Sequence, residues 1–255
     1  MRFKITLSYD GSAFCGWQIQ SNAPSVQGEL EKALSMLLGE QVGVVGAGRT
    51  DAGVNARNYV AHFDCGNVSG NAEDAVLLGK ASLTPGDLCY KLNAILPRAV
   101  AVHSVETAPE GFHARFSATS RQYTYYIHQE KDPFREAFSW YCRFKLDIDS
   151  MNRACSYLPG VHDCGCFEKT GSDNTTSICD IRSAQWVRTQ DGLVFTIEAN
   201  RFLRNMVRAI VGTMVDIGRG VHAPEYILDL FESGSRADAG QSVPGHALFL
   251  TKVSY

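Results

Sequence analysis

A glycine-framed segment, Gly46–Ala56, carries the side chains best suited to chemistry. Three glycines within eight residues predict tight turns or a close approach of the backbone. Asp51 stands where a dinucleotide-binding fingerprint has its third glycine, and no Gly-Lys-Ser/Thr follows as in a P-loop. The loop therefore presents Arg49 and Asp51 together. The alternative reading is an ordinary Asp-Gly-type turn with an incidental ion pair.

A second segment, Phe112–Tyr126, interleaves aromatic residues with arginines. This mixture can stack on bases and neutralise phosphates at the same time. Within the strand expected here, Arg121, Tyr123 and Tyr125 share one face, because side chains alternate with a period of two. An aromatic-rich strand packed on a core is the alternative.

A third segment, Asn200–Gly212, contains three arginines and no acid. In the helix expected here, Arg201, Arg204 and Arg208 lie on one face at positions i, i+3 and i+7, opposite an apolar face. A solvated charged face is the usual explanation. The mutual repulsion of three arginines favours an anionic partner.

The elements that must position these segments alternate between strands and helices. In the first half, a period of two predicts a strand at Phe3–Tyr9, and helical spacing predicts a helix at Val26–Leu38 that ends at Gly39. The other elements expected there are strands near Val42–Gly46 and Asn58–Asp64, a helix near Ala72–Ser82 and a strand near Ala99–Thr107. The order is β-α-β-β-α-β.

The second half repeats this order loosely. The elements expected are a strand at Arg121–Gln129, a helix at Ile148–Leu158, a hairpin of Cys179–Thr189 and Leu193–Ala199, helices at Arg201–Ile217 and Pro224–Glu232, and a strand at Leu248–Ser254. Two such units predict an α+β protein with two ferredoxin-like halves, 1–108 and 109–255, an arrangement common in RNA-binding domains.

Composition excludes several classes of protein. The 255 residues are 45% hydrophobic and 20% charged, which is ordinary for a globular protein. We expect a cytoplasmic protein, because the N-terminus lacks an apolar signal region and no apolar stretch could span a bilayer. The eight cysteines are expected to be reduced and mostly buried. The cluster His162–Cys166 lacks the spacing of a zinc knuckle, so we expect no metal.

The charge is unevenly distributed. The net charge of −3 argues weakly against nucleic acid when it is taken as an average. Arg201–Arg219, however, has four arginines and one acid, a net charge of +3, whereas Gly220–Gly240 has one arginine and four acids, a net charge of −3. A mildly acidic protein can carry a local basic surface, and phosphates contact that local surface and do not respond only to the average charge.

Taken together, these segments resemble the TruA family of tRNA pseudouridine synthases over nearly the whole chain. The resemblance runs through Leu7–Gln18, Ser25–Glu31, Gly48–Ala56, Phe112–Tyr125 and Arg201–Gly212. The string Gly-Arg-Thr-Asp-Ala-Gly is its most specific part.

The resemblance implies a role for each candidate residue. Asp51 is then the catalytic carboxylate, Tyr123 stacks on the target uracil, and Arg208 pairs with the aspartate. Arg49 enters the RNA stem and helps to hold the target nucleotide flipped out. The RNA-binding residues expected are Arg49, Phe112, His113, Ala114, Arg115, Phe116, Arg121 and Arg204.

The resemblance also implies an architecture and a substrate. The two halves would form one continuous, mostly antiparallel sheet flanked by helices, with the active cleft between them. The protein would be a homodimer that binds tRNA across both subunits. It would act without a cofactor on uridines of the anticodon stem-loop, at tRNA positions 38, 39 and 40.

The reaction explains these residue types. The uracil must leave C1′ of the ribose, turn over and rejoin through C5, so it must first be extruded from the stem at a cost of a few kcal/mol. Positive charge develops at C1′, where a carboxylate can attack, stabilise the charge or remove a neighbouring proton. An arginine beside the carboxylate keeps it ionised.

This sequence departs from the family pattern at three places. Asn55 replaces the usual histidine of the aspartate loop, and His162–Phe167 and Val243–Leu248 differ from the usual strings. These departures bear on the RNA contacts of the later loops and so on which uridines are modified.

Two other functions remain open from the sequence. A catalytically silent RNA-binding protein of the same fold would keep the basic and aromatic segments, but it would not need Asp51. A nucleoside hydrolase or glycosidase would usually present a second positioned carboxylate, and no such pair is evident.

Overall fold

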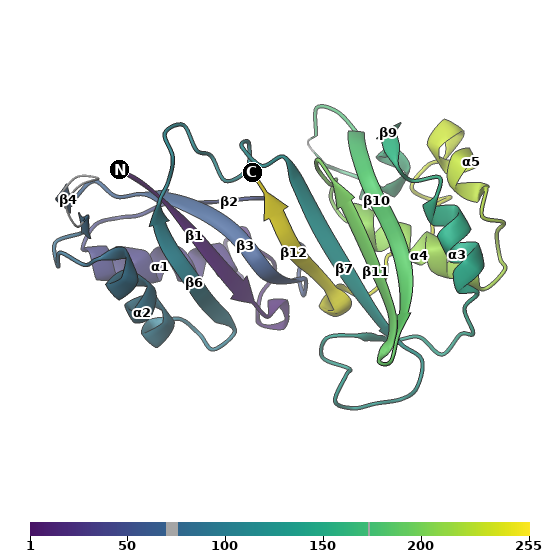
Figure 1. Ribbon diagram of the computed structural model, residues 1–255, viewed down its shortest axis with the longest axis horizontal. Coiled ribbons are helices and arrows are strands. Elements are labelled where there is room, and N and C mark those ends of the chain that lie inside the picture. Colours follow the sequence, from purple (N-terminus) through teal and green to yellow (C-terminus); the bar gives the residue numbers. More distant parts are fainter. Residues whose placement is uncertain (70–75, 173) are drawn as a thin grey trace. The chain divides into compact units, whose positions relative to one another are not determined.

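The computed structural model describes residues 1–69, 76–172 and 174–255, which form two compact units (Figure 1). Unit 1 comprises Met1–Thr119 together with Lys252–Tyr255, and unit 2 comprises Ser120–Thr251. The predicted domains 1–108 and 109–255 stay a prediction.

The main sheet of unit 1 is antiparallel, with the strand order β6-β1-β3-β2. Its strands are β1 (Arg2–Tyr9), β2 (Val44–Gly46), β3 (Asn55–Asp64) and β6 (Val100–Thr107). Every second side chain of β1 is buried, as its period of two predicts. Because β3 lies between β1 and β2, and β1 lies between β3 and β6, each β-α-β connection is split, which is the ferredoxin-like arrangement.

Helix α1 (Val26–Leu38) confirms the predicted range. The Ser25 Oγ accepts a hydrogen bond from the Gly28 N–H at 3.2 Å and caps its beginning. Gly39 ends the helix in the left-handed conformation with φ +69°, which glycine adopts without steric cost. The helix packs against β2 and against α2.

The helix predicted near Ala72–Ser82 is wrong in the described part of that range, since Leu77–Leu78 form β5 and turns follow. Residues 72–75 of that prediction lie outside the described residues. The second helix of unit 1 is α2 (Pro85–Ile95). Thr84 and Asp87 form a capping box, and Pro85 stands at the first helical position, where its fixed φ is favourable. Unit 1 also has η1 (Gly11–Ala13) and the two-stranded sheet of β4 (Val68–Ser69) and β5.

Unit 2 repeats the split arrangement with the strand order β12-β7-β11-β10-β9. The strands are β7 (Ser120–His128), β9 (Gly160–Asp163), β10 (Ile178–Thr189), β11 (Gly192–Ala199) and β12 (Leu248–Ser254), whose residues from Lys252 onward belong to unit 1. The pairings of β7 with β11, β11 with β10 and β10 with β9 are antiparallel, and the short strand β8 (Trp140–Tyr141) pairs with β7 in parallel. The predicted hairpin and last strand are confirmed.

The helices of unit 2 are α3 (Ile148–Cys155), α4 (Met206–Gly218) and α5 (Tyr226–Ser233), and α3 packs against α4 and β10 (Figure 1). Short 3-10 turns η2 (Gly165–Phe167) and η3 (Gly245–Ala247) complete the unit.

The start of α4 corrects the sequence analysis. The helix was expected from Arg201, but Asn205 has a left-handed backbone with φ +65°, which cannot continue a right-handed helix. Arg201 and Arg204 therefore lie outside the helix, and only Arg208 lies within it. The predicted helical face of three arginines is wrong.

The predicted fold class is confirmed: the chain is α+β, with mostly antiparallel strands flanked by helices. Whether the active cleft lies between the halves stays a prediction. In the described parts of the chain, no helix has the length and apolar character needed to cross a membrane.

Candidate active site

Asp51 begins a tight turn in the connection between β2 and β3. The Val54 N–H donates to the Asp51 carbonyl at 3.1 Å, which closes a four-residue turn. Gly53, the third residue, has φ +75°, a conformation that glycine adopts freely and other residues rarely do. The Asp-Ala-Gly sequence thus fixes the backbone of Asp51 locally.

An earlier loop, residues 10–17 between β1 and α1, also contacts this turn. The buried Asn55 side chain accepts the Gly11 N–H at 2.8 Å, and the Trp17 N–H donates to the Thr50 carbonyl at 3.3 Å. A Cβ on Gly11 would lie 2.2 Å from the Val54 oxygen, and a Cβ on Gly16 would lie 2.5 Å from the Thr50 oxygen. The two backbones therefore meet without room for side chains.

Three buried aromatic rings support the arginine-aspartate loop from within unit 1. Trp17 stacks on Tyr59 with ring centroids 4.0 Å apart, and Tyr9 packs against both. The Tyr59 hydroxyl donates to the Gly48 carbonyl, and the Tyr9 hydroxyl lies 2.9 Å from the Thr50 Oγ1. The residues on either side of Arg49 are thus tied to the core.

The loop presents its two charged residues differently. Arg49 is exposed and Asp51 is half-buried. A half-buried carboxylate on a fixed backbone can approach a substrate atom with little loss of conformational entropy. Sequence reasoning predicted these two residues but missed Tyr9, Tyr59 and Thr50, which hold them.

The segment 112–116 forms a second loop of unit 1. Phe112 and Ala114 are buried, His113 is half-buried, and Arg115 and Phe116 are exposed. The Phe116 ring is 77% exposed, although it stacks on the His113 ring at a centroid distance of 4.5 Å. The Arg115 guanidinium lies 5.5 Å from the Phe116 centroid. The loop therefore exposes an aromatic ring and a cation side by side, which suits a base and a phosphate.

Strand β7 positions Arg121 and Tyr123 in unit 2. The two are half-buried on one face, with Tyr125 fully buried further along it. The Tyr123 ring meets the Phe202 ring edge-on at 5.2 Å, and the Arg121 guanidinium donates to the Asn200 carbonyl at 2.8 Å. The shared face predicted from the strand period is consistent with this burial pattern.

Arg208 lies in a polar cluster of unit 2. Its Nε donates to the Val243 carbonyl at 2.7 Å, and the Tyr125 hydroxyl donates to the neighbouring Pro244 carbonyl at 3.0 Å. Burial raises the pKa of Tyr125, and the nearby Arg208 charge acts in the opposite sense. The altered segment that begins at Val243 thus anchors Arg208 through backbone atoms, which any residue type supplies. Arg204 is exposed at the preceding turn.

The predicted residues fall into two sets. Unit 1 gathers Arg49 and Asp51 on one loop and residues 112–116 on another. Unit 2 holds Arg121, Tyr123, Arg204 and Arg208.

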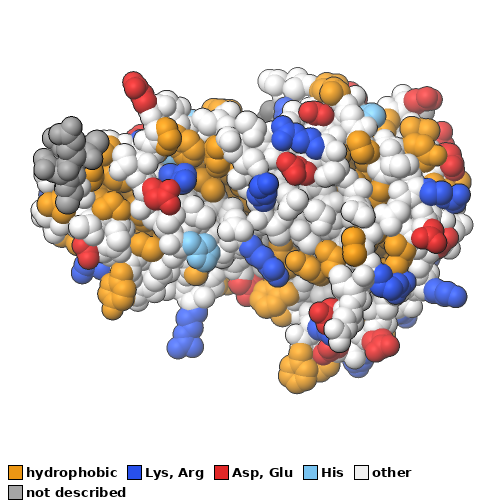
Figure 2. Space-filling model, in the orientation of Figure 1, with side chains coloured by type: hydrophobic (Ala, Val, Ile, Leu, Met, Phe, Trp, Pro, Cys, Tyr) orange, Lys and Arg blue, Asp and Glu red, His pale blue; other side chains and the backbone are white. Residues whose placement is uncertain are grey.

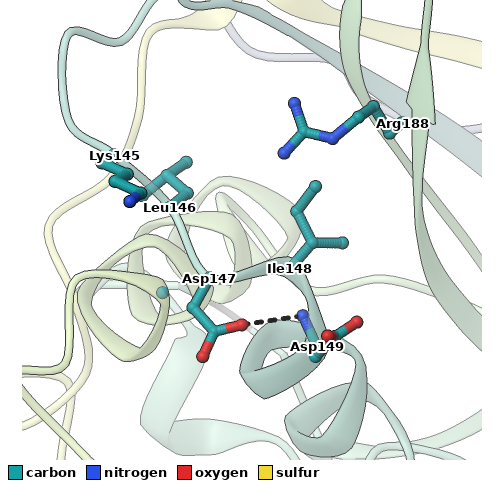
Figure 3. A pocket seen from close by; sticks show the side chains of 7 residues that line it. Lys145, Leu146, Asp147, Ile148, Asp149 and Arg188 are labelled. Carbon is teal, nitrogen blue, oxygen red and sulfur yellow. Dashed lines mark hydrogen bonds between the residues drawn. The ribbon is translucent and has the colours of Figure 1, made fainter.

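A surface hollow in unit 2, of about 560 Å³, contains none of these residues. It is lined by Lys145, Leu146, Asp147, Ile148, Asp149, Arg188 and Gly218 (Figure 3). One Asp147 oxygen accepts the Asp149 N–H at 3.0 Å and the Ser150 N–H at 3.2 Å. Its carboxylate thus caps α3 and is already engaged. We assign this hollow no catalytic role.

The described residues include no metal site built from the cysteines. All eight are free and six are buried, which confirms the prediction of mostly buried thiols. Among the described residues, no group of three or more histidine, cysteine or acidic side chains could hold a metal ion. The hydrogen bond with Cys179, followed by burial, raises the pKa of the Cys164 thiol, which keeps that thiol protonated.

Comparison with known proteins yields one consistent match. A family model described as tRNA pseudouridine synthase matches residues 154–255. A protein of Parabacteroides distasonis named tRNA pseudouridine synthase A is 44% identical over 254 residues, which cover 100% of this chain and 96% of that protein. Proteins of the same name from Porphyromonas gingivalis and Bacillus subtilis are 44% and 38% identical, over 100% of this chain and 97% and 99% of theirs.

Proposed function

The chain belongs to the tRNA pseudouridine synthase A family, an isomerase family, and we propose that it modifies uridines of the tRNA anticodon stem-loop with Asp51 as its catalytic carboxylate. The family converts uridine in tRNA to pseudouridine. The site of modification and the roles of individual residues are the proposal.

The reaction balances within the substrate. The N1–C1′ bond breaks, the C5–C1′ bond forms, C5 loses its proton and N1 gains one. Asp51 either attacks C1′ to give a covalent intermediate or removes a proton next to it. In both cases the carboxylate must be ionised, and Arg208 is the cation proposed to keep it so.

The remaining residues have proposed roles in extruding the base and holding it. Arg49, exposed at the loop, takes the place that the flipped nucleotide leaves in the stem, where its planar cation can stack and contact phosphate. Tyr123 stacks on the extruded uracil, and its edge-on contact with Phe202 fixes the plane of its ring. Arg121, Arg204 and the loop 112–116 contact the RNA around it.

One observation carries the proposal of Asp51. The residue stands in a turn whose backbone is fixed by Gly53, by the Trp17 N–H and by the hydroxyls of the buried Tyr9 and Tyr59, which contact its loop from β1 and β3. An aspartate that served only as a turn former would not need so many supports. Preorganisation of a reacting group explains them.

Three further parts of the proposal follow from the resemblance. The protein acts as a homodimer, the tRNA contacts both subunits, and the enzyme works in the cytoplasm. The mass of the protein in solution tests the homodimer.

The test is tritium release from tRNA that carries uridine labelled at C5. Forming the new carbon–carbon bond expels the C5 hydrogen, so release reports this reaction. We expect wild type to release tritium and Asp51→Ala to release at least about a thousandfold less, since it lacks the reacting carboxylate. Asp87→Asn removes a carboxylate from the same unit at the start of α2 and should keep full activity.

The outcomes discriminate between the open functions. Substantial activity in Asp51→Ala would exclude Asp51 as the catalytic group. Release by neither protein, with tRNA still bound, would favour a silent RNA-binding protein. Sequencing of the product for pseudouridine would show whether positions 38, 39 and 40 are the ones modified.

A further inference from the structure

His62 is a buried histidine that the proposed chemistry does not use. It lies on β3, on the face opposite Tyr59, Ala61 and Phe63, and is 3% exposed. Its Nδ1 accepts the buried Ala114 N–H at 3.0 Å. A ring nitrogen that accepts must be unprotonated, so His62 is held neutral with its proton on Nε2.

Ala114 is the middle residue of the 112–116 loop, and both its N–H and its carbonyl are hydrogen-bonded. His62 accepts its N–H, and the Tyr255 hydroxyl donates to its carbonyl at 2.8 Å. The Arg2 guanidinium donates to the Phe112 carbonyl at 2.8 Å while it pairs with Asp64. The buried half of the loop is therefore held by β1, by β3 and by the C-terminal residue that follows β12.

The exposed half of the loop depends on this anchor through His113. The His113 Nδ1 accepts the Arg115 and Phe116 N–H groups at 3.2 and 3.1 Å, and its ring supports Phe116. The His62 ring meets the His113 ring edge-on at 4.8 Å. A shift at His62 would therefore move the ring on which Phe116 rests.

We propose that His62 is a positioning residue for tRNA binding, because it holds the 112–116 loop in the form that presents Arg115 and Phe116. The inference rests on the proposed RNA contact of this loop. His62 touches no RNA itself and acts only through the Ala114 N–H and the His113 ring.

The charges around His62 favour its neutral state. Arg2 and Lys4 face it from β1, Asp64 lies on its own strand, and His113 lies on the loop. Lys4 is paired with Glu106, and Arg2 is paired with Asp64. Burial, followed by the charge of Arg2 and against the opposing charge of Asp64, lowers the pKa of His62 to about 4. The acceptor is therefore available at neutral pH.

Two substitutions separate the acceptor from the bulk of the ring. In His62→Asn the side-chain Oδ1 replaces Nδ1 as acceptor, whereas His62→Leu fills the space without one. We expect His62→Leu to raise KM for tRNA by about tenfold, which corresponds to about 1.4 kcal/mol, with kcat within about twofold. His62→Asn should recover most of this loss. His103→Leu, which removes another histidine of unit 1, should not change KM.

Amide hydrogen exchange of the peptide covering residues 112–118 measures the stability of the loop's backbone hydrogen bonds in the absence of RNA. Faster exchange in His62→Leu, normal exchange in His62→Asn and the matching KM values would support the inference. Normal exchange and normal KM in a folded His62→Leu would overturn it. Should His62→Leu not fold, Tyr255→Phe tests the other anchor of Ala114 by the same two readouts.

The two proposals fail in different ways. If the loop exchanges faster but neither His62→Leu nor Phe116→Ala changes KM, the loop does not bind tRNA and the role of His62 in binding is overturned. If Phe116→Ala raises KM and His62→Leu does not, the RNA contact survives and the positioning role is overturned.

Discussion

At the residue scale, the candidate site is built from backbone positions that only certain residue types allow. Gly53 supplies the positive φ of the Asp51 turn, and Gly11 and Gly16 let a second loop touch its backbone. Asn55, which replaces the family's usual histidine, is buried and accepts the Gly11 N–H. An amide can serve as acceptor here at any pH, whereas a histidine must be neutral. Asn55 thus supplies a structural contact beneath the Asp51 turn.

The neutral His62 predicts a pH dependence of stability. Its pKa is about 4 in the folded protein and near the ordinary value of 6.5 when unfolded. Between these values the unfolded chain binds a proton that the folded protein does not, so stability falls as pH falls from about 6.5 to about 4. Above this window the contribution is complete, and below it no more is lost.

Urea unfolding at a series of pH values would measure this dependence. Other groups also titrate, so the informative quantity is the difference in unfolding free energy between wild type and His62→Asn, which lacks the titrating ring. We expect this difference to shift in favour of the variant as pH falls through the window. A difference that stays constant from pH 7 to pH 4 would contradict the prediction.

At the element scale, α4 and the segment after α5 pack backbone against backbone. A Cβ on Gly212 would lie 1.9 Å from the Gln241 oxygen, and one on Gly240 would lie 2.4 Å from the Thr213 nitrogen. The Gly240 N–H donates to the Thr213 Oγ1 at 2.9 Å. This close approach brings the Val243 carbonyl to Arg208.

We therefore predict that Gly212→Ala destabilises the protein by about 1–3 kcal/mol or more and also lowers kcat, because the segment that anchors Arg208 must move. Gly86→Ala is the matched control, since Gly86 lies in α2 and the added Cβ would find only the Thr84 Oγ1, at 3.8 Å. That variant should be neutral or more stable by up to about 1 kcal/mol. Thermal unfolding and tritium release would measure both effects. Equal behaviour of the two variants would exclude the packing argument.

The elements that sequence reasoning predicted well are those with local signals. Alternation marks β1, and the Ser25 cap with Gly39 marks both ends of α1. The prediction failed where a nearby signal was overlooked, as at the capping box of Thr84 and Asp87, or where a single backbone conformation decides, as at Asn205. A hydrophobic period does not show whether a single residue within it adopts a left-handed backbone.

The candidate site, like the fold, contains residues that the sequence predicts and residues that it does not. Asp51 and Arg49 stand in a specific string, so the sequence alone predicts them as site residues. His62 was missed because its partner Ala114 lies 52 residues further along the chain, and no local pattern links the two. Tyr9 and Tyr59 look like ordinary strand residues until their hydroxyls are seen to meet the loop.

At the scale of the whole molecule, the question is how a chain of net charge −3 binds a polyanion. Figure 2 shows basic and acidic side chains interspersed over the face in view. Binding that depended on net charge would be unfavourable for such a protein. Binding through a few placed cations would depend on salt only through the phosphates that those cations contact.

Two charge-matched variants distinguish these possibilities. Arg204→Ala and Lys32→Ala both remove an exposed cation and change the net charge from −3 to −4. Arg204 is proposed to contact RNA, whereas Lys32 lies on α1 and has no proposed role. If placed cations govern binding, Arg204→Ala should reduce the slope of log affinity against log salt by roughly 0.7–0.9, and Lys32→Ala should leave it unchanged. Filter binding of tRNA between low and physiological salt would give both slopes. Equal changes in the two variants would mean that net charge, and not the position of Arg204, controls the affinity.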